Sequence, residues 1–356
     1  MPIDTCRLEP LVSSLEHDVL FAMSLGSKEL FHSNLLAFFV RNYRVVGDAV
    51  TGLAGEQAIQ VHREKNHTDL LVEADGVPRV VIENKVFDLP DDEQLFKLAE
   101  EYPSPGTRLV LLSLTPPNWE DRTLPVPGAT GRAWTYQSYG DLAERIRRTL
   151  PDGIEPSSYE GLTLERWLNL VGQLENLAVL TGHPDEGEPL DLDPHVAPIL
   201  RHARLDSAVQ KMRFQHVAGL LRTRGLAGVT VGFSRASALM QWYVADHDGL
   251  WWGWQFQGGQ FRLVLIVPDD HVGYGGKQHR EIREATARQH RAFFDFGSFL
   301  AGRPEMPENP DAFCGYVPNF VYRYVSFPKA TVAEITDLCL ELSQHARAHA
   351  TRLSGS

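Results

Sequence analysis

The stretch VVIENKV, Val80 to Val86, begins as an apolar run, and Glu83 and Lys85 stand near its end. A short run of valine and isoleucine is typical of a strand that is buried in a sheet. Charged side chains are rarely buried unless a partner pairs with them. Residues i and i+2 of a strand point to the same side, so we expect Glu83 and Lys85 on one face. The stretch therefore predicts a buried strand that ends in a charged site.

The residues before this strand predict a hairpin. The strand-like runs TDLLVE and RVVIENK flank the pair Asp75-Gly76, which is a strong turn signal. Asp69 stands near the start of the first run, at the end opposite the turn. Pairing across the turn should bring Asp69 close to Glu83 and Lys85. We therefore expect three ionisable groups at one end of an otherwise apolar hairpin.

Two carboxylates and a lysine at this spacing suit metal-assisted hydrolysis. Asp69 and Glu83 offer the hard oxygen ligands that Mg²⁺ prefers, and Mg²⁺ keeps several waters when a few carboxylates hold it. Lys85 can position or deprotonate a water, or neutralise charge that develops on a phosphate. An E-x-K tripeptide alone is more often a solvated salt pair at a strand edge. The prediction therefore depends on the apolar run, the hairpin and the flanking helices.

The surrounding segments predict an α/β domain. Residues 28–43 and 88–102 have the pattern of helices, and residues 107–114 that of a buried strand. Residues 132–150 predict a short strand and a helix, and residues 161–180 a further amphipathic helix. This order favours a mixed sheet with helices packed on it.

A change of composition divides the chain. Residues 183–195 carry five acidic residues and three prolines, which is typical of a linker or surface loop. We therefore expect a first domain over residues 1–182, a linker or loop over residues 183–195 and an α+β domain over residues 196–356. The last of these should contain a long helix over residues 196–225, an antiparallel meander and two later helices. The sequence gives this second domain no role.

The region from about Lys28 to Leu150 resembles the PD-(D/E)xK nucleases. The matching residues are Asp69 as the first acid, and Glu83 and Lys85 in the run I-E-N-K. The resemblance implies a restriction-endonuclease-like fold. It also implies cleavage of DNA or, less often, of RNA with Mg²⁺ or Mn²⁺. A role in genome defence follows only from association with that family.

The resemblance implies roles for three further residues. Glu29, in the run ELFHSNLLAFF, corresponds to an extra carboxylate of the family's leading helix, and the carbonyl of Asn84 to a further metal ligand. Gln94 corresponds to the glutamine of RecB-like members. Two positions depart from the family pattern: Thr68 replaces the proline before the first acid, and Leu98 stands where the RecB-like pattern has tyrosine.

Plain structural interpretations compete with these roles. Glu29 can be an N-terminal helix carboxylate that the helix dipole favours, with Glu56 or Glu64 in the metal role. Gln94 can be an ordinary polar helix position. His32 is expected to cap or pack rather than to bind a metal.

Basic residues gather in two segments of a chain whose net charge is −12, residues 201–224 and 277–291. They are candidate phosphate-binding surfaces, or else solvated helix faces. The cluster Trp251-Trp252-Gly253-Trp254 suits either base stacking or the filling of a sheet face.

No apolar stretch approaches the length of a membrane helix, and the N-terminus lacks the pattern of a signal peptide. Three widely separated cysteines predict neither a disulfide framework nor a metal site. We therefore expect a cytoplasmic, metal-dependent nuclease that acts on DNA and has no membrane partner. The alternative is a non-catalytic nucleic-acid-binding or assembly module that retains the nuclease fold. The sequence leaves open DNA against RNA, endonuclease against exonuclease action, and whether the chain forms homo-oligomers.

Overall fold

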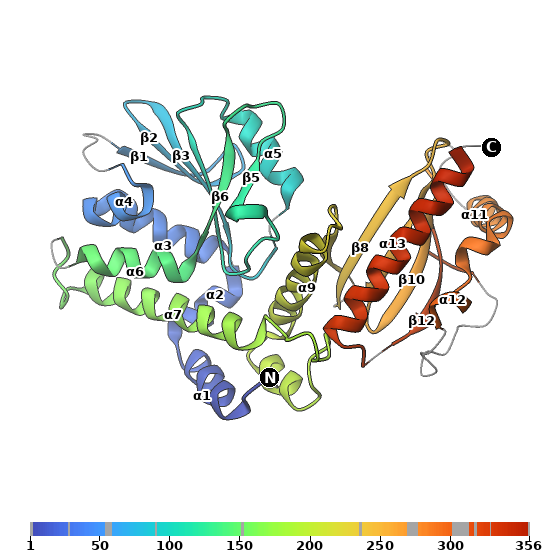
Figure 1. Cartoon of the computed structure of the whole chain (residues 1–356). Coiled ribbons are helices and arrows are strands. Elements are labelled where there is room, and N and C mark those ends of the chain that lie inside the picture. The colour runs from blue at the N-terminus through green and yellow to red at the C-terminus, as the bar shows by residue number, and fades with distance from the viewer. Residues whose placement is uncertain are drawn as a thin grey trace. The chain divides into compact units, whose positions relative to one another are not determined.

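The computed structural model of the chain is shown in Figure 1. It describes residues 3–27, 29–53, 59–89, 91–150, 153–234, 237–268, 277–300, 313–316, 319–327 and 329–354. The chain forms two compact units. The first unit consists of residues 2–183 and 195–215, and the second unit of residues 184–194 and 216–356. Most of the predicted linker, residues 184–194, thus packs with the second unit, and the segment that follows it packs with the first.

The first unit contains a six-stranded mixed sheet in the order β1-β2-β3-β4-β6-β5. Strands β3, β4 and β6 run parallel to one another, and the other neighbours are antiparallel. This confirms the predicted mixed sheet. The strands are β1 (Ile59–Lys65), β2 (Thr68–Ala74), β3 (Val77–Lys85), β4 (Arg108–Ser113), β5 (Thr123–Pro125) and β6 (Ala133–Ser138).

Helices cover both faces of this sheet (Figure 1). Helix α5 (Asp92–Glu101) packs Leu95, Leu98 and Ala99 against a core that includes Val81 of β3. Helices α3 and α6 lie on the opposite face, where α4 and α7 pack with them. The helices besides α5 are α1 (Thr5–Glu16), α2 (Val19–Ser27), α3 (Glu29–Asn42), α4 (Arg44–Thr51), α6 (Tyr139–Thr149), α7 (Tyr159–Thr181) and α8 (Val196–His202). The sequence analysis does not predict α1, α2, α4, β1 or β5.

The predicted long helix over residues 196–225 is wrong, because the chain breaks it into α8 and α9 (Asp206–Thr223). Arg204 has a φ of 59° in the left-handed region, and the amide of Leu205 donates to the carbonyl of Leu200 at 2.9 Å. This bond closes the end of α8 in the manner of a Schellman motif. The first half of α9 belongs to the first unit and the rest to the second.

The second unit contains an antiparallel sheet in the order β11-β12-β10-β9-β8-β7, which confirms the predicted meander. Helix α13 packs on one face, where the indole Nε1 of Trp254 donates to Ser343 Oγ at 2.7 Å. Trp252 and Trp254 are buried, so packing is the correct interpretation for both, whereas Trp251 is 46% exposed. The elements are β7 (Thr230–Ser234), β8 (Ser237–Ala245), β9 (Trp251–Gln257), β10 (Gln260–Ile266), α11 (Lys277–Gln289), α12 (Gly297–Leu300), β11 (Cys314–Tyr316), β12 (Phe320–Ser326) and α13 (Val332–Ser354).

Within the described ranges, none of the helices combines the length and the apolar character that a membrane crossing requires.

Candidate active site

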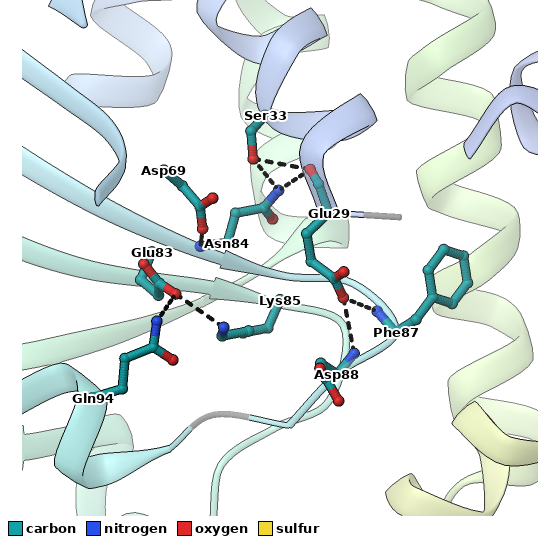
Figure 2. Close-up of polar contacts among 9 residues, drawn as sticks. All are labelled: Glu29, Ser33, Asp69, Glu83, Asn84, Lys85, Phe87, Asp88 and Gln94. Carbon is teal, nitrogen blue, oxygen red and sulfur yellow. Dashed lines mark hydrogen bonds and ion pairs between the residues drawn. The ribbon is translucent and has the colours of Figure 1, made fainter. Parts of the chain in front are cut away.

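The hairpin brings the predicted acidic residues together at the end of β3. Leu70 of β2 pairs with Ile82 of β3, so Asp69 stands one residue further along, beside Glu83. Asp69 Oδ2 accepts a hydrogen bond from the backbone amide of Asn84 at 2.7 Å (Figure 2). Strand β3 is central, because it also pairs with β4 through Lys85. The first carboxylate is therefore held by the main chain of the strand that carries the second.

Glu83 is the most enclosed carboxylate of the site, at 2% exposure. Its Oε1 accepts from Gln94 Nε2 at 2.8 Å and lies 3.0 Å from Lys85 Nζ (Figure 2). Its Oε2 is buried and accepts no hydrogen bond from an N–H or hydroxyl donor within the described part of the chain, and the neighbouring polar group is the carboxyl of Asp69. A buried carboxylate oxygen without a donor is costly, and a cation would relieve that cost.

Burial and mutual repulsion shift the ionisation of these groups. Burial first, and then the charge of Asp69, raise the pKa of Glu83 to about 7. Burial also raises the pKa of Asp69, against the opposing effects of the Asn84 amide and Lys85. Burial alone would lower the pKa of Lys85, but the charges of Glu83 and Asp69 outweigh it and raise that pKa. Without a cation, the pair of Asp69 and Glu83 therefore keeps a proton between about pH 4.5 and pH 7, where an ordinary pair of carboxyl groups would have lost it.

Glu29 lies at the start of α3, and its carboxylate is turned toward the segment that follows Lys85 (Figure 2). Glu29 Oε1 accepts the amides of Phe87 at 2.9 Å and of Asp88 at 3.0 Å. The observed contact is thus with main-chain donors, and a role of Glu29 as a metal ligand stays a prediction. Of its predicted competitors, Glu64 is exposed and pairs with Arg63 at 3.3 Å, and Glu56 lies outside the described residues.

The side chain of Asn84 ties β3 to the helices on the opposite face. Its Nδ2 donates to Ser33 Oγ at 2.8 Å and to the carbonyl of Glu29 at 3.2 Å. Its Oδ1 accepts from the hydroxyl of Tyr139, the first residue of α6. These bonds fix the strand end that carries Glu83 and Lys85. The predicted role of the Asn84 carbonyl as a ligand is not tested by them.

Lys211 of α9 is a residue of this region that the sequence analysis does not assign to the site. Its Nζ donates to the carbonyl of Phe87 at 3.2 Å and to Asp88 Oδ1 at 2.5 Å. The side chain is only 13% exposed. Glu29 and Lys211 therefore hold the same short segment, one through its amides and the other through a carbonyl and a side chain.

Several arginines of the two basic segments have partners within the protein. Arg213 is buried and donates to the carbonyl of Thr181 at 2.9 Å. Arg224 pairs with Glu186 at 2.7 Å and with Asp337 at 2.8 Å. In α11, both Arg280 and Arg288 pair with Glu284. These four arginines are engaged by the protein itself, and phosphate binding by the other basic residues of the two segments stays a prediction.

His32 packs in the interior of the first unit. It is fully buried, and its Nδ1 accepts the indole Nε1 of Trp167 at 3.2 Å. Burial lowers the pKa of His32 to about 3, so the ring is neutral at physiological pH. The predicted packing role is confirmed.

In the portion of the chain that the structure describes, no three His, Cys, Asp or Glu side chains gather closely enough to hold a metal ion. Asp69 and Glu83 are nevertheless adjacent, and Glu83 Oε2 has no other partner there. Two carboxylates with open coordination positions suit Mg²⁺ or Mn²⁺, which keep waters as further ligands. The donor set therefore fits a hard divalent cation.

Comparisons of the chain with protein-family models, with curated proteins and with solved structures found no match. We therefore infer the function from the residues and the geometry of the site.

Proposed function

We propose that the chain is a metal-dependent nuclease that hydrolyses phosphodiester bonds of DNA. In this proposal the first unit has the restriction-endonuclease-like fold of the PD-(D/E)xK nucleases. One observation carries it: a buried Glu83 with an unsatisfied oxygen stands beside Asp69, at the end of the central strand that also carries Lys85. Buried ionised groups add little to the stability of a fold, and perturbed pKa values are common at functional sites, so these charges support a chemical role.

The chain's own residues divide the work. Asp69 and Glu83 Oε2 offer the oxygens for Mg²⁺ or Mn²⁺, and Gln94 fixes the other oxygen of Glu83. A divalent cation bound there supplies positive charge to a phosphoryl oxygen and acidifies a water. Lys85, held beside Glu83, orients the attacking water or stabilises charge that develops on the phosphate. Glu29 and Lys211 hold the segment after Lys85 and so position that lysine.

The test uses the purified full chain with supercoiled plasmid, linear duplex, single-stranded DNA and RNA. Each substrate is incubated with Mg²⁺, with Mn²⁺ or with EDTA. We expect cleavage of DNA only with the metals, and loss of cleavage in Glu83→Gln. Conversion of supercoiled plasmid to open circles would identify an endonuclease, whereas activity on linear ends alone would identify an exonuclease.

Glu93→Gln is the matched control, because Glu93 is an exposed carboxylate one position before Gln94. This variant should retain the wild-type rate. Equal cleavage by the wild type and by Glu83→Gln would point to a contaminating nuclease and contradict the proposal. Binding of DNA without any metal-dependent cleavage would instead identify a nucleic-acid-binding module.

A further inference from the structure

A polar pocket lies in the first unit, between α6 and the strands β4 and β6. Its volume is about 540 Å³, and four arginines line it: Arg108, Arg122, Arg145 and Arg148. Three acidic residues also contribute to the lining, Asp121, Asp141 and Glu144. The pocket is therefore rich in charge, and the pairing of these charges decides what it can bind.

Two of the four arginines are neutralised by acids of the pocket. Arg122 pairs with Asp141 at 2.9 Å and lies over the ring of Tyr136. Arg148 pairs with Glu144, one turn before it on α6. Their charges need no further partner.

Arg108 and Arg145 are different. Arg108 donates through one terminal nitrogen to the carbonyl of Thr51, a neutral acceptor. Arg145 has no hydrogen bond or ion pair among the residues that the structure describes, and its Nε is buried without an acceptor. Neither guanidinium forms an ion pair with a carboxylate in that part of the chain, and the four arginines of the lining exceed its three acids by one positive charge.

These two charges also lie close to each other. Burial first, and then the charge of Arg108, lower the pKa of Arg145, against the opposing effect of Asp141. Folding brings the two guanidinium groups to one pocket and leaves the buried Nε of Arg145 without an acceptor, which is unfavourable. An anion with several acceptor oxygens would reverse both effects, and guanidinium groups match phosphate geometry.

We propose that this pocket binds a phosphate group, and that Arg108 and Arg145 are the residues that hold it. The phosphate belongs either to a small ligand, such as a nucleotide, or to the backbone of a nucleic acid. The proposal does not require that the chain cleave DNA.

The site is distinct from the carboxylates of β3. Glu83 pairs with Leu111 of β4, whereas Arg108 pairs with Val80, three residues earlier along β3. Side chains alternate along a strand, so Arg108 points to the face opposite to that of Leu111 and Glu83. A phosphate held by Arg108 and Arg145 is therefore not the one that Glu83 and Asp69 would act on.

The test measures the binding of three probes in EDTA: inorganic phosphate, a nucleoside 5′-monophosphate, and a DNA oligonucleotide without terminal phosphates. Thermal stability of the full chain is followed at constant ionic strength, with chloride replacing the probe in the reference. Arg145→Gln removes the charge and keeps most of the side-chain stem. Arg147→Gln is the control, because Arg147 is an exposed arginine of the same helix that bonds to Asn169 and does not line the pocket.

We expect at least one probe to stabilise the wild type and the Arg147→Gln control, with at least about ten-fold weaker binding to Arg145→Gln. A response to the monophosphate but not to the oligonucleotide would identify a small ligand, and the reverse would identify a nucleic-acid strand. If Arg145→Gln does not fold, Arg108→Gln replaces it, since Arg108 is exposed at the start of β4. No stabilisation by any probe, or equal stabilisation of all variants, would overturn the proposal.

The Glu83→Gln variant separates this result from the proposed nuclease function. It should bind the phosphate probe as the wild type does, even though it should not cleave DNA. Loss of phosphate binding in Glu83→Gln would mean that the probe occupies the carboxylate site, which also contradicts the proposal.

Discussion

The carboxylate of Asp69 and the backbone amide of Asn84 are joined by a hydrogen bond of 2.7 Å. Through this bond the main chain of β3 orients a carboxylate of β2, and no side chain of β3 is needed for it. The side chain of Asn84 is thereby left to bind Ser33 and Tyr139 on the other face of the sheet. One residue thus connects the proposed metal ligands to the helices that support them, and the expected effects of variants follow from this arrangement.

Asp69→Asn should abolish cleavage while keeping the fold. The asparagine oxygen can still accept the amide of Asn84, but the charge that would hold a cation is lost. We expect the initial rate of plasmid cleavage to fall by at least about 100-fold. Because Asp69 and Glu83 repel each other, the melting temperature in EDTA should be unchanged or higher. A folded variant with the wild-type cleavage rate would exclude Asp69 from the site.

Divalent metal should stabilise the native protein. Metal that binds the native state and not the unfolded chain adds about 2.7 kcal/mol at a hundred times its dissociation constant. The melting temperature should therefore rise by several degrees with saturating Mn²⁺ or Mg²⁺. Glu83→Gln should remove that increment, and Lys85→Ala should retain it while losing cleavage. The same increment in the wild type and in Glu83→Gln would place the metal elsewhere.

Two variants of Glu29 separate its structural contact from a metal-binding role. Glu29→Gln keeps an oxygen for the amides of Phe87 and Asp88, whereas Glu29→Ala leaves both without this acceptor. We expect Glu29→Ala to lower the free energy of unfolding by roughly 1–3 kcal/mol, measured by urea denaturation, and Glu29→Gln to lower it much less. If Glu29 only holds the segment, Glu29→Gln should also keep most of the cleavage rate. Loss of cleavage in a stable Glu29→Gln protein would instead support the ligand role.

The centre of the site could be predicted because its geometry is local. Strand alternation places Glu83 and Lys85 on one face, and the two-residue turn predicts that Asp69 lies near that end of the hairpin. The turn alone does not fix the register, because an irregularity between Val72 and Glu73 shifts the pairing by one residue and so places Asp69 opposite Glu83. The mixed sheet could also be predicted, because the order of strands and helices along the chain favours it. The contact between Gln94 and Glu83 is also present, although the catalytic role of Gln94 stays a prediction.

The supporting contacts could not be predicted, because in them a side chain binds backbone groups of residues that are distant in the sequence. Lys211 reaches Phe87 and Asp88 across more than a hundred residues, and nothing in the sequence of α9 marks it. The same helix carries Arg213, which the sequence predicts to be exposed because it is charged. In the structure its side chain is buried and donates to the carbonyl of Thr181. The break at Arg204 depends on a backbone conformation that glycine usually adopts, so the sequence predicted one helix instead of two.

Lys211→Met tests whether the hold on the segment after Lys85 affects the site. Methionine keeps the buried apolar stem but cannot donate to Phe87 or to Asp88. We expect the free energy of unfolding to fall by about 1 kcal/mol and the cleavage rate to fall several-fold. The stabilisation by metal should remain, because the hydrogen bonds that the variant removes go to Phe87 and Asp88 and not to the proposed ligands Asp69 and Glu83. A wild-type cleavage rate would show that the position of this segment does not matter for activity.

The last prediction concerns the metal-free protein and the raised pKa of Glu83. The native pKa is about 7, and the ordinary value for glutamate is 4.5. Between these two values the native protein keeps a proton that the unfolded chain releases. The contribution of Glu83 to the free energy of unfolding should therefore be highest below pH 4.5, and it should fall as the pH rises toward 7.

Glu83→Gln isolates this contribution, because glutamine does not titrate and the other groups remain. We expect the stability of the wild type, relative to Glu83→Gln in EDTA, to fall between pH 4.5 and 7 by roughly 1–3 kcal/mol. Above pH 7 the difference should be constant. Saturating Mg²⁺ favours the ionised carboxylates and should diminish the fall or reverse it. If the stability difference between the wild type and Glu83→Gln does not change with pH in EDTA, Glu83 has an ordinary pKa. The pair of Asp69 and Glu83 would then not be a strained carboxyl pair that a cation stabilises.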